Sequence, residues 1–321
     1  MPLVTVVMPA RNAGRFLPGV FQMLAPQKGG FELIVTSNAS TDGTEEMFRS
    51  LAADCDFPCV LLTTDKMGVS LARNMGMDRA GGDYVAFADA DDELKADYIS
   101  SLCAFADRGD FDVLLFRHER GGRPARKALG GDGFVSPAEL ARRILVSPDR
   151  YGIYDILVRR SFLVEHAVRF DETLRYFEDY AFLFSLLAAR PRVLCTDRVL
   201  YASAGGEFTD RFEPERFREQ GLPGGIQSDA VRLMGEEGRL VPAGLYRDIL
   251  RTCARRNDYR AFRLFAKETG AREKMKTLCR GCALQIRAGA GLYRLSPGLY
   301  YAAVRLGSAK VLMNRKEKKD Q

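Results

Sequence analysis

The first half of the chain alternates short apolar runs with segments of helical periodicity. Apolar runs that predict strands occupy residues 3–8, 32–36, 60–63, 84–88 and 113–116. Between them, apolar residues recur at helical spacing in 12–24, around Met47, Phe48 and Leu51, in 69–80 and in 96–106. This order of elements predicts an α/β fold with a Rossmann-like, mostly parallel sheet and helices on both of its faces.

The alternation continues to about residue 202 and then stops. Residues 159–166 and 179–189 are predicted to be helical, with two short strands near 193–195 and 199–201. Residues 118–133 are basic and rich in glycine, which favours a surface loop, with a mobile lid as the alternative. Ser136 is expected to cap a helix that begins at Pro137.

Beyond about Glu213, helical periodicity dominates and arginine becomes dense. We therefore expect a catalytic domain at 1–213 and a basic helical region at 214–321. The first segment holds 25 basic and 31 acidic residues, a net charge of −6, and the second holds 23 and 11, a net charge of +12. A basic segment of this kind favours an anionic partner, and we expect a membrane surface. The alternative is a helical subdomain with solvated arginines. No nucleic-acid-binding motif is recognised, so nucleic acid is not an expected partner.

Composition is that of a globular protein, with 46% hydrophobic and 28% charged residues. No apolar run reaches the length that spans a bilayer, and the chain starts with a strand pattern rather than a secretory signal. Seven cysteines without a framework spacing predict reduced thiols in a cytoplasmic protein. Cys279 and Cys282 form a single CxxC, expected as two thiols on a helix, with a metal or redox site as the alternative.

Three carboxylates, Asp89, Asp91 and Asp92, follow the apolar run 84–88 directly. Such a cluster is repulsive unless a cation lies within it, and Mg²⁺ and Mn²⁺ prefer oxygen ligands and share their shell with substrate phosphate. The cluster also comes at the carboxyl end of a predicted strand, where open α/β sheets bind ligands. The alternative is an acidic turn before the next helix, and Asp92 is expected as that helix's cap.

Further polar segments are expected at the same edge of the sheet. Residues 35–44 supply Ser, Asn and Thr side chains suited to a nucleobase or ribose, and Asp42 with Glu45 resembles a capping box. Arg73 is expected near this edge, where it reaches a diphosphate or sugar or forms a surface salt bridge. Glu178 and Asp179 open an apolar helix, either as capping carboxylates or as a general base.

In this order, segments 4–13, 38–44, 71–74, 87–92 and 178–182 resemble the motifs of family-2 glycosyltransferases with the GT-A fold. The resemblance covers about residues 3–202 and is strongest to members that make bacterial cell-surface polysaccharides. Segments 159–163 and 168–172 also look like the stretch that precedes the acid pair in bacterial members.

The resemblance implies a role for each matching residue. Asp89 and Asp91 occupy the DxD positions that hold Mn²⁺ or Mg²⁺, with Asp91 as the direct ligand. Asp179 matches the general base, with Glu178 beside it. The nucleotide-sugar donor is expected to bind at Pro9, Ala10, Arg11, Asn12, Ser37, Asn38, Arg73, Asp89 and Ala90. The implied reaction is inverting transfer of a hexosyl or N-acetylhexosaminyl group, from UDP by preference, to a hydroxyl of a glycan or lipid-linked acceptor. Such an enzyme is expected in the cytoplasm, peripherally on the inner face of the plasma membrane.

Two positions depart from the family pattern. Ser37 and Asn38 stand where many members carry an aspartate pair, which leaves dTDP, CDP and GDP open beside UDP. The segment from Tyr201 to Glu207 lacks the Arg or His that many members carry there, and Arg211 is the candidate substitute. The alternative function is a catalytically degenerate protein that binds nucleotide sugars or polyanions. A Rossmann oxidoreductase is disfavoured because residues 9–14 lack the GxGxxG spacing.

Overall fold

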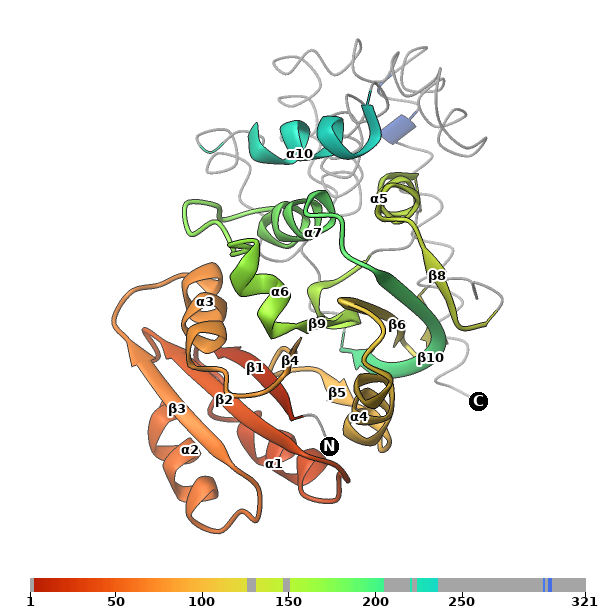
Figure 1. Cartoon of the computed structure of the whole chain (residues 1–321). Coiled ribbons are helices and arrows are strands. Elements are labelled where there is room, and N and C mark those ends of the chain that lie inside the picture. Colours follow the sequence, from red (N-terminus) through yellow and green to blue (C-terminus); the bar gives the residue numbers. More distant parts are fainter. Residues whose placement is uncertain are drawn as a thin grey trace. The chain divides into compact units, whose positions relative to one another are not determined.

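The computed structural model describes residues 3–125, 131–146, 151–204, 220, 224–235, 297, 300 and 301 (Figure 1). The chain divides into two units, Met1–Ile144 with Pro148–Gly206, and Leu145–Ser147 with Glu207–Gln321. The first unit contains the strands and most of the described helices.

A mixed sheet of ten strands forms the centre of the first unit, with the order β3-β2-β1-β4-β9-β6-β10-β5. Strands β3, β2, β1 and β4 are parallel to one another, as are β6 and β10. β9 lies antiparallel between β4 and β6, and β5, β7 and β8 add short antiparallel pairs. The strands are β1 (Val4–Ala10), β2 (Phe31–Asn38), β3 (Cys59–Thr64), β4 (Tyr84–Phe87), β5 (Glu93–Leu94), β6 (Val113–Arg120), β7 (Arg123–Pro124), β8 (Gly133–Val135), β9 (Ile156–Arg159) and β10 (Val193–Ser203).

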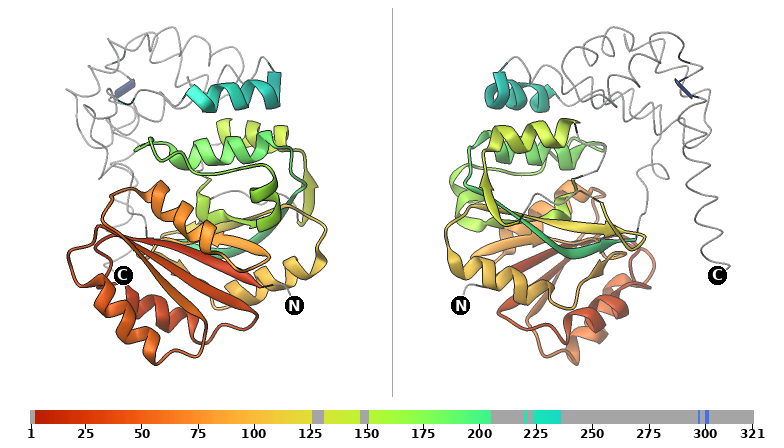
Figure 2. Two further views of the ribbon diagram at one scale, coloured as in Figure 1. Left: turned by 60° about the vertical axis from the view of Figure 1, so that its left-hand side comes forward. Right: turned by 90° about the vertical axis from the view of Figure 1, so that its right-hand side faces the viewer.

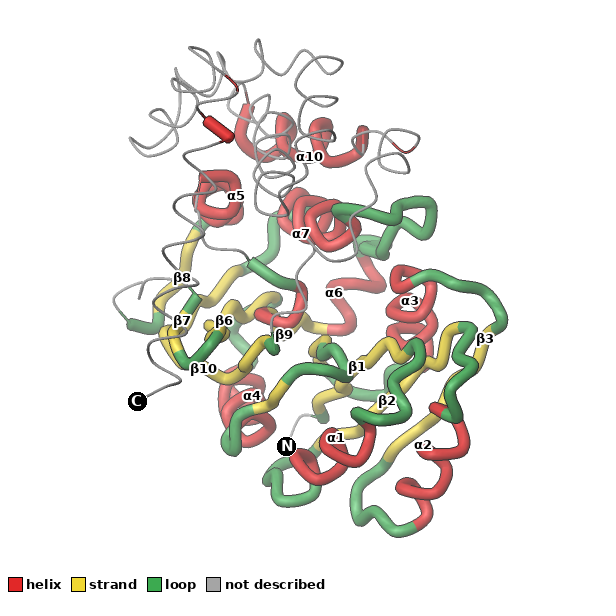
Figure 3. Tube along the Cα trace, turned by 180° about the vertical axis from the view of Figure 1, so that it is seen from behind, coloured by secondary structure: helices red, strands yellow, loops and turns green. Residues whose placement is uncertain are grey.

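The helices of this unit connect the strands as the apolar periodicity predicts. They are α1 (Leu17–Leu24), α2 (Thr44–Ala53), α3 (Val69–Arg79), α4 (Tyr98–Arg108), α5 (Pro137–Val146), α6 (Arg160–Glu165) and α7 (Glu178–Ala188), with a short 3₁₀ turn, Ile153–Asp155. Figure 3 shows how they alternate with the strands along the chain. The predicted cap at Ser136 is confirmed, because its hydroxyl accepts a hydrogen bond from Glu139 N–H at 3.1 Å.

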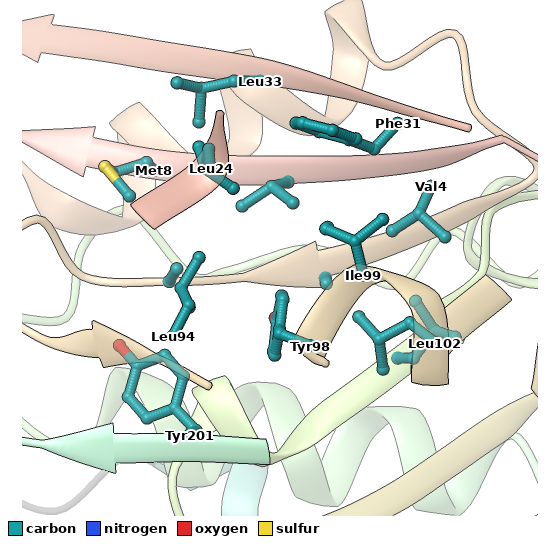
Figure 4. Packing of buried hydrophobic residues seen from close by; sticks show 14 of the residues in the cluster. Val4, Met8, Leu24, Phe31, Leu33, Leu94, Tyr98, Ile99, Leu102 and Tyr201 are labelled. Atoms are coloured by element: carbon teal, nitrogen blue, oxygen red, sulfur yellow. The ribbon is translucent and has the colours of Figure 1, made fainter. Parts of the chain in front are cut away.

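Alternate residues of the central strands face two hydrophobic layers. On one face, Val4 and Met8 pack with Leu24, Leu33 and residues of α4 in a buried cluster (Figure 4). On the other face lies α3, on the opposite side of the sheet from α1 and α2 (Figure 2). The predicted α/β architecture, with helices on both faces of a mostly parallel sheet, is therefore confirmed.

The helix predicted at 159–166 is confirmed as α6, and other local expectations differ from the structure. Just before α6, Ile156–Arg159 forms a strand that was not predicted. Segments 193–195 and 199–201 belong to one irregular strand, β10, whose pairing with β6 shifts register between them. Part of segment 118–133 is paired: β6 extends to Arg120, and its last two residues pair with β7 in a short hairpin.

The second unit is described at one helix and a few single residues. Helix α10 (Gly224–Met234) buries Ile226, Ala230 and Met234, which lie four residues apart and so share one face. Most of the basic segment 214–321, with Cys279 and Cys282, lies outside the described residues. Nothing among the described helices is long and apolar enough to cross a membrane.

Candidate functional site

Polar residues from four elements meet at one edge of the sheet. β1, β2 and β4 run parallel, so the residues that follow their carboxyl ends lie side by side: Ala10 pairs with Ser37, and Phe87 pairs with Val7. The acidic turn, residues 89–92, comes directly after β4. The N-terminus of α7 adds Glu178 and Asp179.

Arg73 is held under this edge by the close approach of α3 to the sheet. A Cβ atom on Gly76 would lie 2.4 Å from Cγ1 of Val7 on β1, so only glycine allows the helix to lie this near. Arg73 lies one helical turn before Gly76 on the same helix. Its side chain is only 4% exposed. The alternative of a surface salt bridge at Arg73 is therefore wrong, because this guanidinium is buried.

The Arg73 guanidinium contacts three carboxylates at once. Its Nη1 lies 2.6 Å from Oδ1 of Asp179 and 3.7 Å from Oε1 of Glu178, and its Nη2 lies 3.3 Å from Oδ1 of Asp89. The Cζ atom of the guanidinium also lies over the ring of Phe170, 5.2 Å from the ring centre. Residues from α3, the acidic turn and α7 are thus joined through one cation.

Charge balance at this cluster is negative, because one guanidinium faces three carboxyl groups. Burial and the neighbouring Asp179 raise the pKa of Glu178 well above its ordinary value. Burial also raises the pKa of Asp179, although the charge of Arg73 lowers it in part. Burial opposes the charge of Arg73, yet Asp179, Asp89 and Glu178 together raise its pKa, so that it stays protonated. The cluster can therefore accept a further cation or a proton.

The start of α7 is set by backbone and aromatic contacts. Phe177 precedes the helix with φ of 63°, a left-handed conformation that is strained for a bulky residue and that turns Glu178 and Asp179 toward Arg73. One turn later, Phe182 packs edge-on against Phe87 of β4, at 5.7 Å between ring centres. The helix N-terminus therefore sits over the carboxyl end of β4.

Asn74, beside Arg73 on α3, fixes the segment that leads to α7. Its side-chain nitrogen donates to the carbonyl of Phe170 at 2.9 Å and to Oε1 of Glu172 at 2.8 Å, and its oxygen accepts from Phe170 N–H at 3.0 Å. The sequence placed Asn74 in the segment 71–74 but gave it no role. Its position next to Arg73 was the available signal.

Asp92 does not cap the next helix, contrary to the sequence-based expectation. Helix α4 begins at Tyr98, with Asp97 as the preceding residue. The two carboxylate oxygens of Asp92 accept hydrogen bonds from the Tyr201 hydroxyl at 2.7 Å and from Ala204 N–H at 2.7 Å. Burial and the charge of nearby Asp89 raise the pKa of Asp92 to about 6. Asp92 thus joins the acidic turn to β10.

The remaining carboxylates of the turn fit a hard divalent cation. Asp89 and Asp91 are both partly exposed and separated by one residue. Within the described residues, no group of three or more His, Cys, Asp and Glu is arranged to hold a metal ion by itself. Mg²⁺ and Mn²⁺ are often bound through one or two carboxylates plus substrate phosphates, so a two-carboxylate site with excess negative charge is compatible with either ion.

The predicted nucleobase residues are brought together, but not all of them are open to a ligand. Ser37 is fully buried and donates to the Ser40 hydroxyl at 3.0 Å. Asn38 is 4% exposed and, with its amide oriented to satisfy both groups, donates to the carbonyl of Ala10 and accepts from Gly68 N–H. Both side chains therefore hold the loops together. The sequence suggested that they would accept a nucleobase N–H, but neither is available to do so.

The other donor-site candidates at this edge differ in exposure. Arg11 and Asn12 are exposed and Pro9 is partly exposed, whereas Ala10 and Ala90 are buried. Asn12 adopts a left-handed conformation with φ of 52°, and its side-chain oxygen accepts from Thr41 N–H at 2.8 Å.

Asp42 binds the two loops of this edge without forming the expected capping box with Glu45. Its carboxylate accepts from Thr44 N–H at 3.1 Å and from Gly14 N–H at 3.0 Å, and the residue that precedes α2 is Gly43. These bonds, together with the Thr44 hydroxyl, lower the pKa of Asp42, although burial acts in the opposite direction. The Asp42 carboxylate thus links the loop after β1 to the start of α2.

Residues 5–145 match the sequence profile of Glycosyl transferase family 2. Among curated proteins, the chain is 27% identical over 205 residues to the poly(ribitol-phosphate) β-N-acetylglucosaminyltransferase TarS of Staphylococcus aureus, covering 62% of this chain and 35% of TarS. It is 32% identical over 105 residues to the putative teichuronic acid biosynthesis glycosyltransferase TuaG of Bacillus subtilis, covering 32% of this chain and 42% of TuaG. These matches thus span between a third and a half of the relatives' own lengths.

Solved structures share the fold. The structure of TarS residues 1–349 from Staphylococcus aureus, in complex with UDP-GlcNAc, superposes with a TM-score of 0.62 at 20% identity, covering 97% of this chain and 92% of that one. A mannosyltransferase from Pyrobaculum calidifontis, in complex with GDP-Man and Mn²⁺, superposes with a TM-score of 0.51 at 15% identity, covering 96% and 87%. At these identities the likeness establishes the GT-A fold.

Proposed function

We propose that this chain, which belongs to glycosyl transferase family 2 through residues 5–145, transfers a sugar from a nucleotide-diphosphate donor to a hydroxyl acceptor with inversion. The observation that carries the proposal is the convergence of Asp89, Glu178 and Asp179 on the buried Arg73. It joins the candidate donor side of the site, at the acidic turn, to the candidate acceptor side, at the start of α7.

Asp179 is the proposed general base. Its side chain is 29% exposed, so an acceptor hydroxyl can reach it, and its Oδ1 is held by Arg73 at 2.6 Å. The carboxylate takes the proton of the acceptor hydroxyl, whose oxygen attacks the anomeric carbon as the bond from that carbon to the diphosphate breaks. The raised pKa of Glu178 favours its protonated form, and a protonated Glu178 adds no negative charge next to Asp179.

Asp89 and Asp91 are the proposed holders of Mn²⁺ or Mg²⁺. When bound, the ion neutralises the negative charge that grows on the departing diphosphate. The three carboxyl groups that converge on Arg73 support this role, because one guanidinium can balance only one of their charges.

The donor is proposed to be a UDP-sugar, with a hexosyl or N-acetylhexosaminyl group. The support is the relationship to TarS, whose structure was solved with UDP-GlcNAc. Exposed Arg11 and Asn12 with Pro9 supply the contacts to the nucleobase, since Ser37 and Asn38 are occupied by internal hydrogen bonds. A thermal-shift panel of UDP-, GDP-, CDP- and dTDP-sugars with Mn²⁺ tests this assignment. A larger shift with a GDP-sugar than with any UDP-sugar contradicts it.

The acceptor is proposed to be a glycan or lipid-linked polymer of the cell surface. TarS and TuaG are named for poly(ribitol-phosphate) and for teichuronic acid, which supports a polymer acceptor. The net charge of +12 at residues 214–321 supports a peripheral position on an anionic membrane, where lipid-linked acceptors are found.

Asp179→Asn tests the catalytic assignment. The amide keeps the shape of the side chain but cannot take a proton, so kcat should fall by about 100-fold or more, whereas calorimetric binding of UDP with Mn²⁺ stays near that of the unaltered chain. Asp78→Asn is the matched control, because Asp78 pairs with Arg169 on an exposed part of the first unit. Normal turnover by Asp179→Asn would rule out its role as the base.

A further inference from the structure

Tyr201, near the end of β10, is bonded to both ends of the acidic turn. Its hydroxyl oxygen accepts a hydrogen bond from Asp89 N–H at 3.0 Å and donates to Oδ2 of Asp92 at 2.7 Å. The residue is fully buried, and Figure 4 shows its ring beside Leu94. A single hydroxyl therefore links two turn residues to a strand more than a hundred residues away in the chain.

Backbone hydrogen bonds and the Arg73 guanidinium, whose Nη2 lies 3.3 Å from Oδ1 of Asp89, also hold the turn. Asp92 N–H donates to the carbonyl of Asp89 at 3.2 Å, which closes the turn, and Ala88 N–H donates to the carbonyl of Val7 at 3.1 Å just before it. The second oxygen of Asp92 accepts from Ala204 N–H, three residues after Tyr201. Both oxygens of Asp92 are thus engaged by Tyr201 and by Ala204, the residue after β10, while Asp89 and Asp91 remain partly exposed.

The ring of Tyr201 is itself held in place. It stacks on Tyr154 with 4.7 Å between ring centres and an angle of 4° between the planes. Tyr154 contacts the buried His118 edge-on at 5.0 Å, and Nδ1 of His118 lies 2.8 Å from Oδ1 of Asp155. Asp155 also accepts from Gly152 N–H at 3.1 Å.

The backbone reinforces this arrangement. Tyr201 pairs with Leu94 of β5 on one side and with His118 of β6 on the other, so its Cα is fixed between two strands. A tyrosine has only two side-chain torsions, and stacking restricts both of them. The hydroxyl therefore has a fixed position, from which it can hold the Asp89 amide and the Asp92 carboxylate in place.

We propose that Tyr201 is a positioning residue that sets the geometry of Asp89 and Asp91 for the divalent metal and the donor diphosphate. It acts through the Asp89 amide and the Asp92 carboxylate and does not itself contact the donor. The inference rests on the proposed function, because it assigns the acidic turn to metal and diphosphate.

Loss of the hydroxyl leaves the Asp89 amide and one Asp92 oxygen without their partner, and the turn loosens. Groups that orient metal ligands from behind typically change metal affinity by about 10- to 100-fold when they are removed. The Tyr201→Phe chain should therefore need at least about 10-fold more Mn²⁺ for half-maximal UDP binding, with a higher KM for the donor and a smaller change in kcat.

Tyr98→Phe is the matched control. Tyr98 is also fully buried in the same hydrophobic cluster, its ring centre lies 6.5 Å from that of Tyr201, and its hydroxyl has no hydrogen-bond partner among the described residues. Both variants remove one buried oxygen from a tyrosine. A general effect on packing appears in both, whereas a positioning effect appears only in Tyr201→Phe.

The experiment uses the full chain and three readouts: Mn²⁺ titration monitored by paramagnetic resonance, calorimetric binding of UDP with and without Mn²⁺, and thermal unfolding. We expect weaker Mn²⁺ and Mn²⁺-dependent UDP binding for Tyr201→Phe, and wild-type binding for Tyr98→Phe. Equal affinities in the two variants overturn the proposal. Absence of Mn²⁺-dependent UDP binding in the unaltered chain instead overturns the proposed function and, with it, this inference.

Asp92→Asn provides a second, independent variant if Tyr201→Phe does not fold. Its amide has one oxygen for two donors, so it cannot satisfy both Tyr201 and Ala204. We expect the Mn²⁺ affinity of Asp92→Asn to fall by a similar factor. The double variant, Asp92→Asn with Tyr201→Phe, should bind Mn²⁺ about as tightly as the weaker of the two single variants. Unchanged affinity for Asp92→Asn, or single effects that multiply fully, overturns the proposal because the two groups then act separately.

Discussion

At the scale of single residues, the site depends on a cation that is almost completely buried. Arg73 has three carboxylates around it and an aromatic ring below it, and its side chain is 4% exposed. Burying an arginine in this way carries a desolvation cost. Replacing it while its carboxylate partners remain strongly destabilises the fold, because their buried charges are then unbalanced. The guanidinium of Arg73 reaches Asp179 and Asp89 with two separate nitrogens in a fixed plane, whereas lysine has a single nitrogen.

Arg73→Lys should therefore reduce both stability and turnover. The ammonium keeps the charge but cannot hold Asp179 and Asp89 together, so we expect kcat to fall by about 10-fold or more and the free energy of unfolding to fall by about 1–3 kcal/mol. Steady-state kinetics and urea unfolding measure the two effects. Arg169→Lys is the control, since Arg169 pairs with Asp78 at an exposed position where a pair contributes about 0–1 kcal/mol. Wild-type kcat for Arg73→Lys would contradict the role of Arg73.

The pH dependence of transfer should show the raised pKa values of the acid pair. The proposed mechanism requires a deprotonated Asp179, and burial raises its pKa, so its protonated form persists to a higher pH than for an exposed aspartate. We expect kcat/KM to rise with pH through an apparent pKa above the ordinary carboxyl range. The apparent pKa belongs to the coupled pair of Asp179 and Glu178. A rate already constant from pH 4.5 upward would contradict this expectation.

At the scale of elements, the sequence predicted the parallel half of the sheet better than the antiparallel half. β1, β2 and β4 are apolar runs that lie buried, as is typical of strands in a parallel sheet, and β3 is a partly buried strand at the edge. β9 is only four residues long and runs directly into α6, and no strand was predicted there. Its place between β4 and β6 depends on long-range pairing, which no local pattern encodes.

The same distinction applies to the candidate site. Asp89, Arg73 and Asp179 were identified because each lies in a recognisable segment: Asp89 after β4, Arg73 within α3 and Asp179 at the start of α7. The hydrogen bond between Tyr201 and Asp92 was not predicted, because it joins residues 109 positions apart. The burial of Tyr201 and its stacking on Tyr154 also exist only in the folded chain. The burial of Ser37 was missed because its partner, Ser40, lies in a loop whose conformation the sequence does not fix.

The contact between α3 and β1 provides a test at this scale. Gly76→Ala places a methyl group 2.4 Å from Cγ1 of Val7, so the helix must move away from the sheet and carry Arg73 with it. We expect a loss of about 1–3 kcal/mol in the free energy of unfolding, together with a lower kcat. Chemical unfolding and transfer assays on the same preparation measure both.

Gly19→Ala is the corresponding control on α1. Its added Cβ would meet no atom within 4 Å among the described residues, and alanine favours the helix, so this change should stabilise the chain by about 0.5–1 kcal/mol without altering kcat. If Gly76→Ala behaves like Gly19→Ala, the close approach of α3 does not position Arg73.

At the scale of the whole molecule, charge is divided along the chain. Residues 1–213 carry a net charge of −6 and residues 214–321 carry +12, ending in the basic run Arg315, Lys316, Lys318 and Lys319. The proposed metal-dependent site lies in the acidic segment, and the proposed contact with an anionic surface lies in the basic segment. The charge pattern therefore supports a division between chemistry and attachment.

Attachment to an anionic membrane should be electrostatic and reversible. Each basic residue near such a surface contributes about 1 kcal/mol, and the contribution falls as salt screens it. We expect the full chain to cosediment with liposomes that contain phosphatidylglycerol, to remain in the supernatant with neutral phosphatidylcholine liposomes, and to be released by about 0.5 M salt. Replacing Arg315, Lys316, Lys318 and Lys319 with glutamate should weaken cosedimentation while leaving Mn²⁺-dependent UDP binding intact, since the candidate donor site lies in the first unit. Equal partitioning of the unaltered chain between the two kinds of liposome at low salt would contradict membrane attachment and leave the basic segment as a solvated helical region.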